Sequence, residues 1–465
     1  MSSAARVRLQ GASSTPFWLD RPDRPAPRAA LPGAARADLV VVGGGLTGLW
    51  TALQAAEDGK SVVLLEGERL AFGASGRNGG FCAASLTHGL GNGLERWPDE
   101  LEALERLGRE NLEAIAATIA RHGIDCGWEP TGTIDVATAP HQLPWLEQEA
   151  ALLRRYGWDA EVLDAAGVRA QVDSPTYVGG LATRDACALV DPARLCWGLA
   201  AAAESAGAVV HERTAVRSLQ PDGAGVRAEC DGGGVVRARG VLLATAAFPP
   251  LVRAIRRYVV PVYDYVLVSE PLSEAQRDAI GWRGRQGVSD LANQFHYYRQ
   301  TDDHRILWGG YDAVYDFGGR VGPARDQRPA TFARLAEHFA TTFPQLEGLR
   351  FSHRWGGAID TCSRFSALWG RALGGRAVYV VGFTGLGVGA SRFGARVGLD
   401  LLDGLDTERT RLEMVRRRPL PFPPEPVRWA GITLTRRALA RADRREGRRG
   451  PWLKTLDRLG LGFDS

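Results

Sequence analysis

Residues 38–66, DLVVVGGGLTGLWTALQAAEDGKSVVLLE, decide the fold of this chain. The pattern predicts a buried strand, a glycine-rich turn, a helix and a second strand that ends at Glu66. Gly43, Gly45 and Gly48 have the GxGxxG spacing, which permits a tight turn, close approach of a pyrophosphate and close packing of the helix on the strand. The helix N-terminus would face the phosphates, and Glu66 would accept the ribose hydroxyls of an adenosine. The stretch therefore predicts a Rossmann-type unit that binds a dinucleotide.

A second glycine-rich loop, GASGRNGG, follows at residues 73–80. Its free backbone N–H groups and small side chains allow a flat polar ring to approach closely. A unit that binds NAD would normally continue into a helix here, so the loop favours FAD. We expect Arg77, inside the loop, to lie under the ring and to stabilise its reduced anion.

The loop resembles the second flavin-contacting loop of the D-amino-acid oxidase/glycine oxidase family of FAD-dependent oxidoreductases, and most closely that of its γ-glutamylputrescine oxidoreductase-like branch. Three other segments resemble motifs of this family in the family's order: residues 208–219, a strand against the adenine; 238–248, a strand and turn; and 376–404, a strand, a glycine-rich turn and a helix. That helix would point its N-terminus at the pyrimidine end of the flavin. The resemblance covers about residues 36–410.

The resemblance implies an α/β fold, α+β overall, of the glutathione-reductase-2-like type. A Rossmann-type FAD-binding domain would carry an inserted substrate domain built on an antiparallel sheet. Helical spacing over 98–122 and 143–156 and strand patterns in 261–269 and 293–310 agree with two insertions. The expected parts are an N-terminal arm, 1–35; the discontinuous FAD-binding domain, 36–92, 191–249 and 355–410; the substrate domain, 93–190 and 250–354; and a basic C-terminal extension, 411–465.

The motifs imply a set of FAD contacts and no metal site. These contacts are Gly43, Gly45, Leu46, Thr47, Gly48, Glu66, Gly73, Ala74, Ser75, Gly76, Arg77, Asn78, Gly79, Gly80, Val216, Ala244, Thr245, Gly382, Thr384, Gly385, Leu386, Gly387 and Val388. Ala358 stands where the sarcosine-oxidase branch of the family attaches its flavin, so we expect FAD to be bound non-covalently.

The strands of the second insertion are expected to form the wall of the substrate pocket. Aromatic faces attract cationic amines, and a tyrosine near Tyr297 or Tyr298 contacts substrate in relatives. Side chains alternate across a strand, so only one of these two would face the flavin. The catalytic residues expected are Arg77, Tyr298 and Trp308, and the pocket residues expected are Tyr265, Tyr297, Arg299 and Tyr311. Arg299 would bind a substrate carboxylate or pair with a nearby aspartate.

These features predict an FAD-dependent oxidoreductase that acts on the C–N bond of an amine or amino acid. Hydride transfer to flavin N5 would leave an imine, which water hydrolyses to an aldehyde or oxo acid. The acceptor would be O2, giving H2O2, or another compound. Sarcosine-oxidase relatives use a lysine for the oxygen reaction, and Trp308 stands at that position here. Dehydrogenation of 2-hydroxy acids, tailoring of a natural product, and a flavin-binding subunit with a membrane- or partner-binding tail are the alternatives.

Composition is that of a globular cytoplasmic protein, with 45% hydrophobic and 24% charged residues. The sequence has no apolar run of the ~18 residues that span a bilayer and no apolar N-terminal signal. The six cysteines have no zinc-ligand spacing and are expected to be free. Phe17 and Trp18 are expected to dock the N-terminal arm on the main body.

Charge is concentrated at the C-terminus. Residues 411–465 contain 14 Lys/Arg and 6 Asp/Glu, a net +8, although the whole chain is only +4. A proline-rich linker, 419–426, precedes a helix that we expect to dock through Leu434 and Leu439, with its arginines in solvent. Weak contact with a membrane surface is the alternative. Nucleic-acid binding is not expected, since no recognisable module surrounds the arginines.

Overall fold

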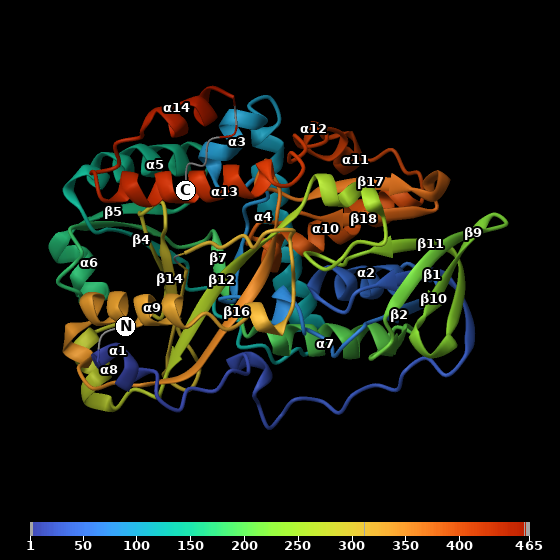
Figure 1. The fold of residues 1–465 in the computed structure, drawn as a ribbon, viewed down its shortest axis with the longest axis horizontal. Helices are drawn as coiled ribbons and strands as arrows, with labels where there is room; N and C mark the ends of the chain where they lie inside the picture. The colour runs from blue at the N-terminus through green and yellow to red at the C-terminus, as the bar shows by residue number, and fades with distance from the viewer. Residues whose placement is uncertain (1–2, 311, 460, 462–465) are drawn as a thin grey trace.

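Two large β-sheets lie side by side in the computed structural model, which describes residues 3–310, 312–459 and 461 (Figure 1). The first sheet has the order β17-β18-β11-β1-β2-β8, and the hairpin of β9 and β10 extends from β11. Its strands are β1 (Ala34–Val42), β2 (Val62–Leu65), β8 (Val209–His211), β9 (Val216–Asp222), β10 (Gly225–Cys230), β11 (Val235–Leu243), β17 (Leu368–Ala372) and β18 (Ala377–Val381). The core strands β18, β11, β1, β2 and β8 are parallel.

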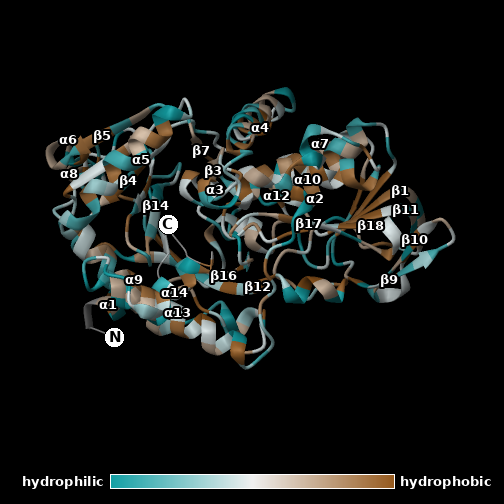
Figure 2. Cartoon of the chain, turned by 90° about the horizontal axis from the view of Figure 1, so that it is seen from above, coloured by the Kyte–Doolittle hydropathy of each residue, from teal (hydrophilic) through white to brown (hydrophobic). Residues whose placement is uncertain are grey.

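Helices cover one face of the first sheet. They are α2 (Leu46–Glu57), α4 (Leu101–Arg121), α7 (Pro192–Ser205) and α10 (Gly387–Leu402). Helix α10 packs on both α2 and α4, and α2 also packs on α7. Hydrophobic residues concentrate in β1, β11 and β18, as Figure 2 shows, because parallel strands are buried on both faces. This parallel sheet with helices packed on it is the Rossmann-type arrangement that residues 38–66 predict.

The segment 208–219 differs from its prediction as one strand. It forms β8 and the start of β9, with a turn between them in which Arg213 has a φ of 52°. The buried carboxylate of Glu212 in this turn accepts hydrogen bonds from the backbone N–H groups of Arg28 and Leu70. These two hydrogen bonds hold the turn in place and satisfy a buried polar side chain.

The second sheet has the order β16-β12-β15-β14-β13-β4-β6-β5. Its strands are β4 (Thr133–Ala137), β5 (Ala160–Asp164), β6 (Gly179–Thr183), β12 (Val260–Ser269), β13 (Gly287–Asp290), β14 (His296–Gln300), β15 (Ile306–Gly310) and β16 (Phe351–Thr361). All pairs are antiparallel except β13 with β4. Both insertions thus contribute to one sheet, and β16 continues past the domain boundary expected at residue 355.

Other helices surround this second sheet. They include α1 (Ser3–Arg8), α3 (Leu90–Arg96), α5 (Leu143–Arg155), α6 (Ala165–Gln171), α8 (Glu274–Ile280) and α9 (Pro329–Thr342), while α11 (Glu408–Arg411) and α12 (Glu413–Arg416) follow α10. Helix α9 packs on β12 and β15. A two-stranded sheet of β3 (Phe81–Ala83) and β7 (Cys187–Leu189) joins the two halves of the molecule. None of the helices in the described part of the chain is long and apolar enough to cross a membrane.

Both ends of the chain return to the body. Phe17 and Trp18 are buried, which confirms the expected docking of the N-terminal arm. The C-terminal extension forms α13 (Val427–Asp443) and α14 (Pro451–Arg458), which turn back over the region of the second sheet (Figure 1). Leu434 is 47% exposed, so it does not dock α13 as expected, whereas Leu439 points inward. The six cysteines are free and buried.

Candidate functional site

The glycine turn between β1 and α2 has the close contacts that its spacing predicts. A Cβ atom on Gly43, whose φ is 113°, would lie 2.5 Å from the carbonyl oxygen of Ala244. On Gly48 it would lie 1.9 Å from the carbonyl oxygen of Gly43, so α2 packs against the turn itself. Glu66 accepts hydrogen bonds from the backbone N–H groups of Gly44, at 2.6 Å, and Glu68, at 2.8 Å. The carboxylate is therefore fixed at the end of β2, beside the turn.

The second glycine loop is held from outside by two indoles. Trp355 Nε1 donates to the carbonyl of Arg77 at 2.9 Å, and Trp18 Nε1 donates to the carbonyl of Asn78 at 2.8 Å. On its inner side, Ser75 Oγ accepts a 2.9 Å hydrogen bond from the backbone N–H of Leu46, the first residue of α2. The loop and the positive end of α2 are thus joined at one point, as a dinucleotide site requires.

A cavity of about 1130 Å³ extends from this point toward the second sheet. Many of the predicted FAD contacts line its inner end: Leu46, Thr47, Ala74, Ser75, Arg77, Asn78, Gly79, Ala244, Thr384, Gly385, Leu386, Gly387 and Val388. No described atom lies within 4 Å of a Cβ built on Gly385, so the turn before α10 is open to a ligand. Backbone donors and open glycines from three segments fit the flavin end of an FAD.

The remaining predicted FAD contacts lie outside the cavity lining. They are Gly43, Gly45, Gly48, Glu66, Gly73, Gly76, Gly80, Val216, Thr245 and Gly382. Several of the glycines are required by packing, since a Cβ on Gly76 or Gly80 would lie 2.3 Å or 2.2 Å from a carbonyl oxygen. Ala358 lines the cavity with a methyl group, which has no nucleophile for a covalent flavin link.

Arg77 lines the cavity, but its charge is already paired. Its Nη1 atom lies 2.8 Å from Asp326 Oδ2 and donates to the carbonyl of Gly356 at 2.9 Å. Its Nε atom donates to the carbonyl of Phe72 at 2.9 Å, and the guanidinium lies over the Phe72 ring. The side chain thus joins the flavin loop to β16, and Asp326 offsets the charge that we expected Arg77 to offer a reduced flavin.

Tyr297 is the aromatic residue of β14 that faces the cavity. A Cβ on Gly79 of the flavin loop would lie 2.7 Å from its ring, so the ring lies directly against that loop. Tyr298 points to the opposite face, where its hydroxyl bonds that of Tyr177 and its ring lies 4.5 Å from that of Trp308. Tyr298 and Trp308 are therefore in the core against α9, contrary to their expected catalytic positions, because alternate side chains face opposite ways.

Two of the other expected pocket residues are also structural in this fold. Tyr265 is fully buried and donates to the carbonyl of Arg325 at 3.0 Å. Arg299 is 3% exposed and donates a hydrogen bond to the carbonyl of Val190 at 2.7 Å. It therefore neither forms an ion pair with an aspartate nor points into the cavity, where it could bind a substrate carboxylate. Tyr311 lies outside the described residues.

Asp264 is a cavity residue that sequence reasoning missed. It lies on β12 between Tyr263 and Tyr265, which belong to the buried cluster against α9, and it accepts a hydrogen bond from the hydroxyl of Tyr297. Burial raises the pKa of Asp264 to about 6, opposed by the Tyr297 hydroxyl and by backbone N–H groups. A charged residue that alternates with aromatic core residues in YDY was the signal that pointed to this face.

Three more carboxyl groups line the same cavity. They are Asp135 on β4, Glu105 on α4 and Glu149 on α5. Burial raises the pKa of Glu149 to about 7, and the neighbouring Asp135 and Glu105 raise it further. Glu105 accepts a 2.8 Å hydrogen bond from Trp158 Nε1, and Asp135 accepts one from the Ser289 hydroxyl.

Acidic side chains outnumber arginines in the cavity lining, and burial raises the pKa of Glu105, Asp135, Glu149, Asp264 and Asp360. Seven carboxyl groups line the cavity, against three arginines, Arg77, Arg428 and Arg436. Five of the carboxyl groups form no ion pair with a described residue: Glu105, Asp135, Glu149, Asp264 and Asp360. All three arginines have partners: Asp326 for Arg77, the Pro423 carbonyl for Arg428 and Asp312 for Arg436. The surplus of carboxyl groups favours a cation, and Arg428 is the one lining arginine that is bonded to a carbonyl and forms no ion pair with a described residue.

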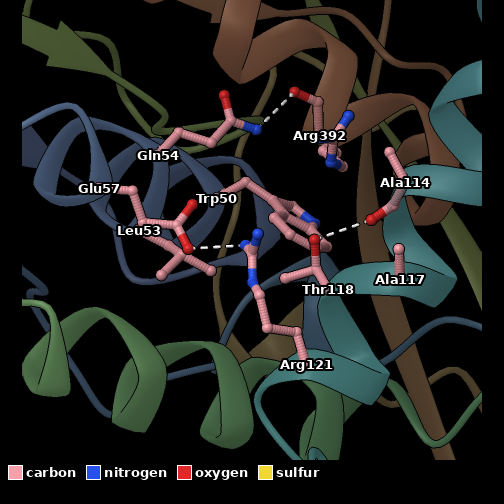
Figure 3. A pocket seen from close by; sticks show the side chains of 9 residues that line it. All are labelled: Trp50, Leu53, Gln54, Glu57, Ala114, Ala117, Thr118, Arg121 and Arg392. Carbon is pink, nitrogen blue, oxygen red and sulfur yellow. Dashed lines mark hydrogen bonds and ion pairs between the residues drawn. The ribbon is translucent and has the colours of Figure 1, made fainter.

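A smaller pocket of about 200 Å³ lies elsewhere, between α2, α4 and α10 (Figure 3). Trp50, Gln54, Thr118 and Arg392 are among its lining residues, and none of the residues predicted for the FAD or substrate site lines it. The large cavity is therefore the one that the flavin motifs reach.

Comparison with known sequences identifies the same chemistry. A profile of the family described as FAD dependent oxidoreductase matches residues 38–401. Gamma-glutamylputrescine oxidoreductase of Escherichia coli (strain K12) is 34% identical over 391 residues, which cover 83% of this chain and 87% of that protein. A probable oxidoreductase, OrdL, of Haemophilus influenzae is 28% identical over 381 residues, which cover 80% of this chain and 84% of that protein.

Comparison with solved structures confirms the fold. Glycine oxidase from Geobacillus kaustophilus superposes with a TM-score of 0.67 at 21% identity, covering 80% of this chain and 96% of that one. L-proline dehydrogenase from P. horikoshii gives a TM-score of 0.66 at 18% identity, and the match covers 80% of this chain and 95% of that one. The expected Rossmann-type FAD-binding fold with a second sheet domain is thus correct.

Proposed function

Because this chain belongs to the family of FAD-dependent oxidoreductases, we propose that it oxidises a cationic amine whose reacting carbon carries no carboxylate. FAD is its cofactor, and it is bound non-covalently because the position of the covalent link in one branch of the family is Ala358 here. The observation that carries the proposal is the surplus of acidic groups in the cavity, where five carboxyl groups lie outside any ion pair and two of the three lining arginines are paired with aspartates. An ammonium group gains from such a lining, whereas a carboxylate next to the C–N bond would meet repulsion.

The E. coli relative supports this substrate class. Its printed name describes an enzyme that acts on gamma-glutamylputrescine, a compound with a primary amine. The same reasoning disfavours a 2-hydroxy acid, whose carboxylate would meet the surplus of carboxyl groups and, at any arginine other than Arg428, would have to displace Asp326 or Asp312. Displacing a buried partner leaves that partner's charge unpaired, which costs about 3 kcal/mol or more.

Asp264 and Tyr297 are the residues that we assign to the reacting amine. Both lie on the sheet face toward the flavin loop, and Tyr297 contacts that loop directly. The carboxylate of Asp264 accepts a proton from the substrate ammonium, so that the neutral amine is the form that reacts. When bound, FAD accepts the hydride from the carbon next to nitrogen, and water then hydrolyses the resulting imine.

Tyr297 and the walls of the cavity orient the substrate and exclude water. The Tyr297 ring offers a π face to the cation, and its hydroxyl holds the Asp264 carboxylate in place. Lys60 is paired with Asp403 at 2.6 Å and lies outside the lining, so no lysine in the described cavity assists the oxygen reaction. We propose O2 or another compound as electron acceptor, to be decided by the rate of reoxidation.

The test is an anaerobic titration of the purified flavoprotein with butylamine, putrescine, D- and L-alanine, glycine and DL-lactate. We expect the visible absorbance of oxidised flavin to bleach with the amines and to remain with the amino and hydroxy acids. Return of the colour within seconds of admitting air would identify an oxidase, and a return over many minutes another acceptor. Bleaching by alanine or lactate at lower concentration than by butylamine would overturn the proposal.

A further inference from the structure

The C-terminal extension supplies one wall of the large cavity. Residues of the proline-rich segment 420–423 and of both helices α13 and α14 line it, among them Ile432, Leu439 and Leu456. Across the cavity stand Trp145, Glu149 and Leu153 of α5, together with Trp158, whose indole N–H bonds Glu105. The part of the cavity between these two walls, which we call the outer chamber, is continuous with the part lined by the flavin loop.

Polar contacts, and not a packed core, hold this wall in place. Asp443 Oδ1 accepts a hydrogen bond from the backbone N–H of Asn293 at 2.9 Å, and Arg436 Nη1 lies 3.0 Å from Asp312 Oδ1. Glu425 accepts hydrogen bonds from the Tyr315 hydroxyl and the backbone N–H of Gly318. These anchors all lie on loops at the rim of the second sheet, so the extension bridges the cavity.

The inner face of the extension is apolar but only partly buried. Ile432 and Leu439 recur at helical spacing on α13 and face the cavity, whereas Leu434 is exposed to solvent. Ala442 is the buried residue of α13, and Leu453 is that of α14. Most helices of this length are stabilised by packing an apolar face, and here that face borders open space. Its burial is therefore completed only when an apolar ligand fills the chamber.

We propose that the outer chamber binds the hydrocarbon portion of the substrate, so that the enzyme selects amines with an extended apolar chain. The proposal rests on the amine function proposed above and deepens it. The amine nitrogen lies at Asp264 and Tyr297, and the chain runs outward between Trp145 and the inner face of α13. Filling the chamber adds contacts to Leu439 and Ile432 and holds the extension closed over the substrate.

The first test compares primary n-alkylamines from propylamine to octylamine by anaerobic stopped-flow. In the wild-type enzyme, each added methylene is expected to raise the ratio of reduction rate to dissociation constant about fourfold until the chamber is full. Leu439→Ser is expected to lower that ratio about tenfold for octylamine and less than twofold for propylamine. Leu434→Ser makes the same chemical change on the exposed face of the same helix and should behave like wild type.

The second test measures closure without turnover. The connection between α13 and α14 contains the exposed Arg444, Arg445 and Arg448, so trypsin can cut there when the extension opens. Octylamine should slow cleavage at these sites at least threefold in wild type and in Leu434→Ser, but not in Leu439→Ser. Propylamine should have no effect.

The outcomes separate the two proposals. If no amine bleaches the flavin but octylamine still protects against trypsin, the proposed reaction fails and the chamber stands. If amines bleach the flavin with no dependence on chain length, or if both serine variants behave alike, the chamber assignment is wrong and the amine reaction stands.

Discussion

At the scale of the residue, Asp264 decides how a substrate amine is handled. Asp264→Asn keeps the size of the side chain and the contact to the Tyr297 hydroxyl, but removes the proton acceptor. We expect flavin reduction by butylamine at pH 7 to slow about 100-fold, the range found for loss of a general base. Stopped-flow absorbance measures the rate. The FAD content of Asp264→Asn should equal that of the wild type. Tyr297→Phe should slow flavin reduction less than tenfold. If Asp264→Asn reduces its flavin at the wild-type rate, Asp264 has no role in the reaction.

Glu149 gives the cavity a pH dependence near neutrality. Because its pKa is raised from 4.5 to about 7, the folded protein binds a proton that the unfolded chain has lost between these values. This contribution to stability is present below pH 4.5 and is lost as the pH rises to 7. Above pH 7 the same carboxylate is ionised and attracts cations.

The corresponding prediction concerns binding of an amine that stays charged throughout, such as butylamine. Its affinity should rise as the pH increases from 6 to 8, and Glu149→Gln should remove most of that rise. The affinity is measured at each pH by titrating the flavin spectrum with the amine. Glu147→Gln, on the exposed side of α5, is the control. A rise that is equal in Glu149→Gln and wild type would place the titrating group elsewhere.

Arg77 is expected to act on stability as much as on the flavin. Arg77→Met leaves Asp326, whose carboxylate is mostly buried, without its cation. We expect a loss of about 3 kcal/mol in the free energy of unfolding together with weaker FAD retention. Urea unfolding measures the first quantity and flavin fluorescence the second. Arg77→Met with Asp326→Asn should recover part of the stability, and Arg106→Met, which removes two exposed ion pairs, with Glu110 and Glu408, should cost less than about 1 kcal/mol.

At the scale of the element, the N-terminal arm supports the flavin loop. Trp18 is 1% exposed and its indole N–H bonds the Asn78 carbonyl, so this one side chain both packs and orients the loop. Trp18→Phe retains most of the packing and is expected to cost about 1 kcal/mol through the lost hydrogen bond. Trp18→Ala is expected to cost about 3 to 5 kcal/mol and to release FAD. Thermal unfolding and dialysis against buffer without FAD measure the two effects, and unchanged FAD retention in Trp18→Ala would contradict this role of the arm.

At the scale of the whole molecule, charge holds the extension to the body. Residues 411–465 carry a net +8, and the whole chain carries +4, so the other residues carry −4. Raising NaCl from about 20 mM to 500 mM shortens the Debye length to a few ångströms and should weaken this attraction. We expect tryptic cleavage between α13 and α14 to accelerate at least threefold, measured by mass spectrometry. Cleavage sites on the body should be unaffected by salt, and equal acceleration at all sites would mean a general effect on trypsin.

The two glycine motifs, the dinucleotide fold and the FAD cofactor were readable from the sequence, because each depends on local spacing. Gly48 is required by a contact within the βαβ unit itself, whereas Gly43 also lies against the carbonyl of Ala244, which follows β11. The same local logic predicted β12, β14 and β15 of the second sheet and the docking of Phe17 and Trp18, but not the strands that the first insertion contributes.

Only the tertiary structure decided which side chains face the cavity. A strand pattern such as HYYRQ tells the reader that neighbours alternate, but the choice between Tyr297 and Tyr298 depends on which face α9 covers. The pairing of Arg77 with Asp326 joins residues 249 positions apart, and no local pattern predicts such a contact. Nor does the basic composition of the C-terminal extension reveal that Ile432 and Leu439 close the substrate cavity, because the space they border is built by segments distant in the chain.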